Sequence, residues 1–177
     1  FLRGEPKYVR MWGLLKPNNQ ILGSDIAGHV EAIGGEVTEF APGDAVFGDI
    51  FETWGGLAEY VCALEKDLIV KPTGITFEEA ASIPQAAIVA LQGLRDSGKI
   101  QAGQKVLING GGGGAGTFAI QLAKFYGAEV TAVDSAIKLE LMTSLGADHV
   151  IDYEKEDFTR NNQQYDLIIE FIARRSI

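Results

Sequence analysis

Residues 105–124 read KVLINGGGGGAGTFAIQLAK, and this stretch decides the fold. The apolar run over 105–109 predicts a strand, the glycines predict a tight turn, and the periodic apolar residues that follow predict a helix. Gly111, Gly113 and Gly116 have the G-x-G-x-x-G spacing of a dinucleotide-binding turn. The spacing alone is weak evidence, but the strand–turn–helix context is the one that such a turn requires.

Residues without side chains let backbone N–H groups approach a pyrophosphate, and the N-terminus of the following helix adds partial positive charge. We therefore predict that the dinucleotide lies against Gly111, Gly113, Gly114, Ala115 and Gly116. A flexible glycine linker would not be flanked by a buried strand and an amphipathic helix. A dinucleotide usually indicates redox chemistry.

The overall composition limits the possible partners. The chain has 177 residues, 46% of them hydrophobic, which allows one large domain or two small ones with a real core. Its formal net charge of -9 disfavours nucleic acid and anionic membrane surfaces. No run approaches the roughly 20 apolar residues that span a bilayer. The single cysteine, Cys62, is compatible with a reducing compartment, so we expect a cytoplasmic protein.

The first part of the chain is rich in predicted strands separated by glycine turns. A capping box of Thr76 and Glu79 then begins a helical pattern over 77–94, which Pro84 divides in two. The four strands are expected over 26–34, 45–48, 56–62 and 68–70. Short strands with glycine turns favour a small barrel-like β domain.

Strands and helices alternate in the second part, which predicts a parallel sheet with crossover helices. Strands are expected over 105–109, 129–133, 149–153 and 165–171, and helices over 114–126, 137–145 and 156–160. We place the domains at 1–78 and 79–177. Because the chain begins with Phe1 and ends just after its last predicted strand, we expect a fragment of a longer protein.

The second strand of the parallel sheet ends at Asp134, about 20 residues after the glycine turn, where a ribose-binding residue belongs. The Asp134 carboxylate favours NAD, because it would repel a 2′-phosphate. Lys138 would pair with that phosphate and favours NADP, while the Ser135 hydroxyl suits either. Asp134 is also a good helix N-cap, and Lys138 an ordinary solvated lysine, so the sequence leaves the choice between NAD(H) and NADP(H) open.

Tyr153 follows the third strand and would lie near the adenosine, although half-buried packing explains a tyrosine there equally well. We expect no metal site, because His29, His149 and Cys62 do not cluster. Cys62 is expected to be a small buried apolar residue.

These residues resemble the medium-chain dehydrogenase/reductase superfamily, and most closely its zinc-independent quinone oxidoreductase (zeta-crystallin-like) branch. The resemblance extends over nearly the whole chain. Besides the glycine turn, it is carried by GSDIAGHVEAIG at 23–34, FAPGDAVFG at 40–48, GGLAEY at 55–60 and LGADHVIDY at 145–153.

The resemblance implies an α/β fold: a partial GroES-like β domain followed by a partial Rossmann domain, a doubly wound parallel sheet. It also implies hydride transfer from NAD(P)H to a quinone, an enone or another small-molecule carbonyl substrate, and a homodimer in the full-length form. Residues matching Lys138 and Tyr153 help to hold the NADP 2′-phosphate in this family. No catalytic residue is assigned.

Four departures from the family pattern are informative. Ser24 stands where zinc-dependent relatives have a histidine ligand, and the loop Asp49–Gly55 lacks the cysteines of their structural zinc site, which indicates zinc independence. Val89 replaces a threonine that lies near the nicotinamide in relatives. Asp134 replaces a small residue, which weakens the NADP assignment.

Two other functions compete with an oxidoreductase. If the missing segments hold the substrate residues, the chain is a non-catalytic nucleotide-binding remnant or a crystallin-like structural protein. A methyltransferase also places glycines after one strand and an acid after the next, but it does not explain the segments at 40–48 and 55–60. A Walker A loop is excluded because Thr117 follows Gly116 where that loop has lysine.

Overall fold

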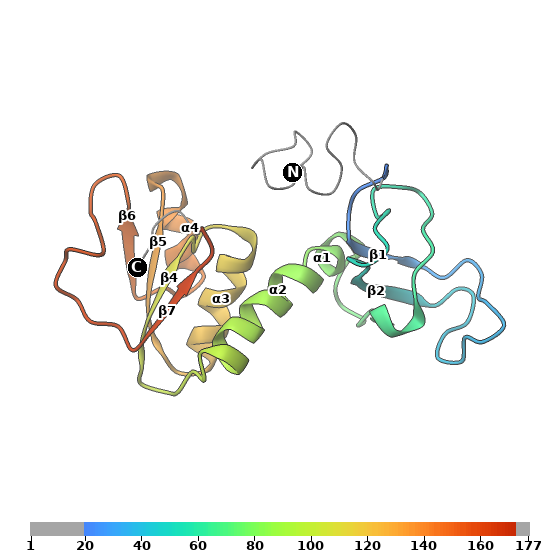
Figure 1. The fold of residues 1–177 in the computed structure, drawn as a ribbon, viewed down its shortest axis with the longest axis horizontal. Coiled ribbons are helices and arrows are strands. Elements are labelled where there is room, and N and C mark those ends of the chain that lie inside the picture. Colours follow the sequence, from blue (N-terminus) through green and yellow to red (C-terminus); the bar gives the residue numbers. More distant parts are fainter. Residues whose placement is uncertain (1–19, 173–177) are drawn as a thin grey trace. The chain divides into compact units, whose positions relative to one another are not determined.

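The computed structural model describes residues 20–172 (Figure 1). Contacts within the chain divide it into two compact units between Pro84 and Gln85. The division that the sequence predicts, between residues 78 and 79, lies a few residues earlier and stays a prediction. Residues 1–19 and 173–177, which the two predicted domains include, lie outside the described residues.

The first unit contains an antiparallel sheet in the order β1-β2-β3. Its strands are β1 (Asp25–His29), β2 (Ala45–Asp49) and β3 (Leu68–Val70), and the short 3-10 helix η2 (Glu65–Asp67) precedes β3. In register, Ala27 lies opposite Phe47, and Phe47 lies opposite Ile69. A Cβ at Gly48 would collide with the carbonyl oxygen of Asp67, so β2 approaches this backbone only because it has a glycine there.

Two strand predictions in this unit were wrong in extent. The strand predicted over 26–34 ends at His29: Val30 still exchanges backbone hydrogen bonds with Asp44 and Gly43, and the chain then leaves the sheet and turns where the Val37 N–H donates to the Gly34 carbonyl. No described strand covers 56–62: only Gly56 and Leu57 donate to a neighbouring backbone, at Gly23 and Leu22. Without a described partner strand, alternation alone does not make a strand.

Cys62 corrects a further expectation, since it is exposed rather than buried. It lies in the same 56–62 segment, where Leu57 and Tyr60 are also exposed. The apolar residues of this segment have no sheet face to cover them among the described residues, and Cys62 shares that surface position.

The two helices of the helical region begin where the sequence predicts, at the capping box and at the proline. The helix α1 (Phe77–Ala81) begins at the capping box: the Thr76 hydroxyl accepts the Glu79 N–H at 3.1 Å, and Glu79 Oε2 accepts the Thr76 N–H at 2.8 Å. The helix α2 (Pro84–Leu91) begins at the predicted proline, whose missing N–H costs nothing in a first turn. It runs into a π-helical turn, η3 (Gln92–Ser97), so the helical region ends three residues beyond the prediction.

The second unit is a parallel sheet in the order β6-β5-β4-β7 (Figure 1). Its elements in chain order are β4 (Lys105–Asn109), α3 (Gly114–Phe125), β5 (Glu129–Asp134), η4 (Ala136–Lys138), α4 (Leu139–Ser144), β6 (His149–Asp152) and β7 (Leu167–Glu170). The predicted α/β class and parallel sheet are confirmed, with element ends within a few residues.

The helix predicted over 156–160 was wrong, because this segment forms turns. The Asp157 carboxylate accepts both the N–H and the hydroxyl of Thr159, at 3.1 and 2.7 Å. Asp152 likewise accepts the N–H of Glu154 at 3.1 Å. Such local side-chain acceptors offer the backbone an alternative to helical hydrogen bonds.

The core lies on both faces of the parallel sheet, as the alternation of side chains along each strand requires. On one face, Val106, Ile108 and Val130 pack against Ala119 and Ile120 of α3. On the other face, a smaller cluster forms from Leu107, Val133, Ile151, Phe158 and Tyr165. The larger cluster fixes α3 against β4 and β5, and so determines where the glycine turn lies.

An ion pair fastens α3 to the start of β5 and β6. Lys124 Nζ contacts both Asp148 oxygens, at 2.9 and 2.7 Å, and Asp148 Oδ2 also accepts the Val130 N–H at 2.7 Å. Burial raises the pKa of Asp148, but the hydrogen bonds from Lys124 and Val130 outweigh it, and the pKa lies below its ordinary value. Both side chains are about a third exposed, so the pair is worth about 1 kcal/mol or less.

We expect Asp148→Asn to lower the free energy of unfolding at pH 7 and to make no difference at low pH. Because the folded-state pKa is depressed, the stabilisation is present above the unfolded-state pKa of about 3.9 and is lost as the pH falls through the folded-state value. Urea titrations of both proteins from pH 7 to pH 3 measure this. A difference that stays constant over that range would contradict the expectation, and Lys124→Met should remove most of the pH-dependent part.

Candidate nucleotide-binding site

The glycine turn joins the carboxyl end of β4 to the first turn of α3. Gly110 has φ +89°, which favours glycine, and its N–H and that of Gly111 both donate to the Val133 carbonyl, at 2.9 and 3.1 Å. Gly113 is the N-cap of α3 and donates to the Gly110 carbonyl at 3.0 Å. The turn is therefore anchored to β5 on one side and closed on itself on the other.

Two of the motif glycines are required by packing within the protein. A Cβ at Gly116 would collide with the carbonyl oxygen of Gly110 and lie 2.7 Å from Gly111 Cα. A Cβ at Gly111 would lie 2.9 Å from both Ala132 Cβ and Met142 Sδ. These glycines let the helix approach the strand ends closely, and their role can be explained without a ligand.

Gly113 and Gly114 differ, because a Cβ on either would meet little protein. The nearest atom to a Cβ at Gly113 is the Gly110 oxygen at 3.3 Å, and at Gly114 it is Ala86 Cβ at 3.9 Å. The N–H groups of Gly114, Ala115 and Gly116 begin the helix, where no intrahelical acceptor exists, and none of the residues 20–172 accepts them. An uncovered backbone with free donors at a helix N-terminus suits a diphosphate.

Asp134 ends β5 beside this turn, and it is 8% exposed. Its Oδ2 accepts the Gly112 N–H at 3.0 Å, while its Oδ1 accepts the Ser135 N–H at 2.8 Å and lies 3.3 Å from the Ser135 hydroxyl. The residue is not the N-cap of the next helical turn, since Ser135 holds that position without a side-chain cap.

The sequence presents Asp134 and Lys138 as opposite indications of the cofactor, but in the structure they form an ion pair. Lys138 Nζ lies 3.4 Å from Asp134 Oδ1 and 3.5 Å from Asp134 Oδ2. Its side chain covers Gly112, where a Cβ would collide with the lysine stem. Tyr153 is half-exposed directly after β6, and its N–H donates to the Asp134 carbonyl at 3.2 Å. The structure thus brings the glycine turn, Asp134, Ser135, Lys138 and Tyr153 to one edge of the sheet.

Sequence reasoning missed Gly112, which it treated as a variable position within the motif. Gly112 both donates to Asp134 and leaves room for the Lys138 side chain. The only signal in the sequence was the unbroken run of five glycines from Gly110 to Gly114, three more than the motif needs in that interval.

The two histidines make separate contacts: His29 Nδ1 lies 3.1 Å from the Gly43 carbonyl, and His149 Nε2 lies 3.2 Å from Glu129 Oε1. Within the described part of the chain, no three His, Cys, Asp or Glu residues are grouped so that they could hold a metal ion. The described residues also contain no helix with the length and apolar character that crossing a membrane requires.

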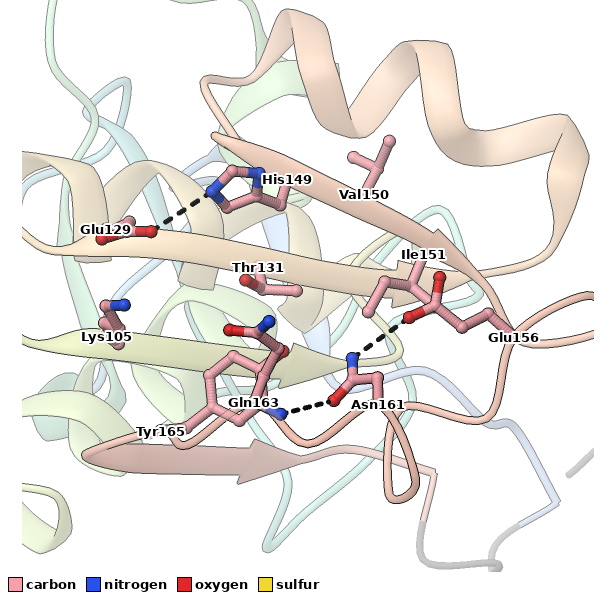
Figure 2. Close-up of a pocket in the computed structure, with 10 residues that line it drawn as sticks. All are labelled: Lys105, Glu129, Thr131, His149, Val150, Ile151, Glu156, Asn161, Gln163 and Tyr165. Carbon is pink, nitrogen blue, oxygen red and sulfur yellow. Dashed lines mark hydrogen bonds and ion pairs between the residues drawn. The ribbon is translucent and has the colours of Figure 1, made fainter.

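A cavity of about 290 Å³ lies along one face of the parallel sheet and reaches from the amino ends of its strands to Ile151, near the carboxyl end of β6 (Figure 2). Lys105, Glu129 and His149, the first residues of β4, β5 and β6, line it together with the 156–165 segment. The strands are parallel, so their amino ends lie at the edge away from the glycine turn. None of the residues that line the cavity belongs to the glycine turn or is Asp134, Ser135, Lys138 or Tyr153, so the cavity is separate from the candidate nucleotide site.

Comparison with known proteins agrees with this arrangement. Residues 6–73 match the family described as alcohol dehydrogenase GroES-like domain, and residues 114–177 match the family described as zinc-binding dehydrogenase. The order of the two matches is the order of the two units. The chain belongs to the medium-chain dehydrogenase/reductase superfamily.

Three similar proteins locate the chain within this superfamily. A 2-methylene-furan-3-one reductase of Solanum lycopersicum and a chloroplastic NADPH-dependent alkenal/one oxidoreductase of Arabidopsis thaliana are each 40% identical; each alignment covers 89% of this chain and 43% of the relative. The structure of the quinone oxidoreductase from Coxiella burnetii is 36% identical with a TM-score of 0.82, over 88% of this chain and 50% of that one.

These relatives belong to the quinone oxidoreductase-like branch of the superfamily, as the sequence motifs predicted. The chain spans half or less of the length of these proteins. The first unit corresponds to the GroES-like domain and the second to the Rossmann-like parallel sheet, which confirms the predicted fold class.

We expect Gly116→Ala to lower the free energy of unfolding by about 2 kcal/mol or more, because its methyl group would meet backbone that cannot move aside. Gly114→Ala is the matched control two residues earlier, where the methyl group has space and alanine favours the helix by up to about 1 kcal/mol. Chemical denaturation measures both. Equal stability of the two variants would show that the helix does not depend on this close approach.

Proposed function

We propose that the protein to which this chain belongs is an NAD(P)H-dependent oxidoreductase that transfers hydride to an enone, a quinone or another small carbonyl compound. The observation that carries the proposal is the turn at Gly113 and Gly114, whose backbone is uncovered and whose following N–H groups have no described acceptor. The names of the similar proteins, which are reductases of enones and a quinone oxidoreductase, support the substrate class.

When bound, the reduced nicotinamide supplies the hydride, and the chain's own residues bind and orient the dinucleotide. In this proposal the N–H groups of Gly114, Ala115 and Gly116 donate to the diphosphate, and Gly113 leaves room for it. Lys138 and Tyr153 lie at the adenosine side, where the lysine ammonium suits a 2′-phosphate. This placement, together with the NADPH dependence stated in the name of the Arabidopsis relative, favours NADP(H) over NAD(H).

We propose that the reaction needs no zinc. Ser24 has no imidazole to offer at the position of the family's zinc ligand, and the loop Asp49–Gly55 contains no cysteine. In addition, we propose that the full-length protein is a homodimer in the cytoplasm, with a domain boundary near residue 78. The low cysteine content supports the cellular location.

Gly113→Val should abolish measurable binding of NADPH, because its side chain would stand where the diphosphate approaches the backbone. The fold should persist, since a Cβ there meets only the Gly110 oxygen at 3.3 Å, a contact that a shift of a few tenths of an ångström relieves. Isothermal titration of the purified chain measures the affinity, and Gly35→Val is the control, at an exposed position with nothing within 4 Å of a Cβ. Unchanged affinity in Gly113→Val would refute the proposed site.

The reaction itself is tested by mixing the full-length protein, NADPH and a conjugated enone or quinone. Oxidation of the nicotinamide, with reduction of the acceptor, is expected at a rate that falls to background in Gly113→Val. A protein that binds NADPH but transfers no hydride to any acceptor of these classes would instead support the second candidate, a nucleotide-binding protein without catalytic activity. Chelation of metal ions should leave the rate unchanged if zinc has no part.

A further inference from the structure

We propose that Asp134 is a positioning residue that holds the glycine turn, and not a residue that reads the ribose or repels the 2′-phosphate. This inference rests in part on the proposed function, because it concerns how the same site recognises its nucleotide. It assigns to Asp134 the task of holding Gly112, Ser135 and Lys138 in place.

The hydrogen bonds of Asp134 are already made within the protein. Oδ2 accepts the N–H of Gly112, and Oδ1 accepts the N–H of Ser135. One donor thus precedes Asp134 in the sequence and the other follows it. Hydrogen bonds that a carboxylate accepts from backbone N–H groups are among the strong ones. A ribose hydroxyl would have to compete with these donors for the carboxylate oxygens. The Asp134 side chain as a whole is only 10% exposed.

The charge of Asp134 is also matched within the protein. Lys138 Nζ lies 3.4 Å from Oδ1, in an i,i+4 pair whose lysine is 37% exposed. The carboxylate of Asp134 and the ammonium of Lys138 pair with each other. A nucleotide at this edge of the sheet therefore meets a neutralised ion pair rather than an unpaired negative charge. The repulsion of a 2′-phosphate that the sequence suggested is therefore weakened at its source.

The hydrogen bond from the Gly112 N–H to Asp134 acts as a tether for the glycine turn, and the run of glycines explains why a tether is needed. The five consecutive glycines from Gly110 to Gly114 form the longest glycine run in the sequence, and glycine leaves the backbone more conformational freedom than any other residue. The Val133 carbonyl anchors the start of this run, and the helix anchors its end. Asp134 anchors the middle, at Gly112, one residue before the glycine that must stay open to the diphosphate.

The matched control is Asp152, the register partner of Asp134 on the neighbouring strand. It also ends its strand, is 7% exposed, and pairs with a lysine, Lys155, at 3.5 Å. Its carboxylate accepts the Glu154 N–H and makes no contact with the glycine turn among the described residues. Asp152→Ala therefore removes a similar buried carboxylate without touching Gly112.

The first measurement is the rate of amide hydrogen exchange at individual residues of the nucleotide-free chain, monitored by NMR. In Asp134→Ala, exchange at Gly112 should be about tenfold faster or more relative to Leu107 in the core, because its charged acceptor is gone. In Asp152→Ala, the ratio of the two rates should stay as in the wild type. An unchanged ratio in Asp134→Ala would overturn the proposal, whatever the chain binds.

The second measurement is the affinity of the same variants for NADH and NADPH. Loss of the tether should weaken NADH binding by about tenfold, since the diphosphate is common to both nucleotides, and NADPH binding at least as much, because Lys138 also loses the partner that holds it. A residue that repels the 2′-phosphate would produce the opposite result, a gain for NADPH on removal, and that gain would overturn the proposal. If the wild type binds neither nucleotide, the proposed function fails, while the exchange measurement still decides the role of Asp134.

A variant with one acceptor left guards against loss of folding in Asp134→Ala. Asp134→Asn keeps a single carbonyl oxygen for the two backbone donors and removes the charge facing Lys138. It should show the same changes in exchange and affinity in smaller measure. Faster exchange confined to Ser135, with Gly112 unaffected, would contradict the proposed tether.

Discussion

The site depends on the close approach of the first turn of α3 to the backbone at the end of β4. This approach is possible because Gly116 lacks a side chain against the Gly110 carbonyl, and because Gly111 fits between Ala132 and Met142. Any Cβ at these positions would push the helix outwards, and its N-terminal N–H groups would no longer lie at the carboxyl edge of the sheet. A constraint on packing thus produces a backbone surface suited to an anion.

The glycines of the turn have different roles, although they are alike in the sequence. Gly111 and Gly116 are needed by the fold, whereas Gly113 and Gly114 keep the backbone uncovered. Gly112 has a third role: it donates to Asp134 and makes room for Lys138. The same residue type therefore serves packing, anchoring and, in the proposed function, the approach of the ligand within one turn, and substitutions at neighbouring positions separate these roles experimentally.

Local patterns predicted most of the parallel sheet, because each strand is a short apolar run between residues that favour turns. The run at 105–109 and the capping box at Thr76 were confirmed residue for residue. Prediction failed where the outcome depends on a partner elsewhere. The alternation at 56–62 has no described strand beside it, and the helical pattern at 156–160 gave way to the carboxylate of Asp157, which accepts nearby donors.

The spacing of residues along the chain determined the position of the glycine turn and the alternation of strands and helices in the parallel sheet, while the family was identified by the resemblance of its motifs. The sequence left Asp134 and Lys138 as opposing indications of NAD and NADP. Only the tertiary structure showed that they form one pair beside Gly112, 22 residues away from Asp134 in the chain. The physical reason is that hydrogen bonding and charge pairing depend on distance in space, and parallel strands bring the ends of distant segments to one edge.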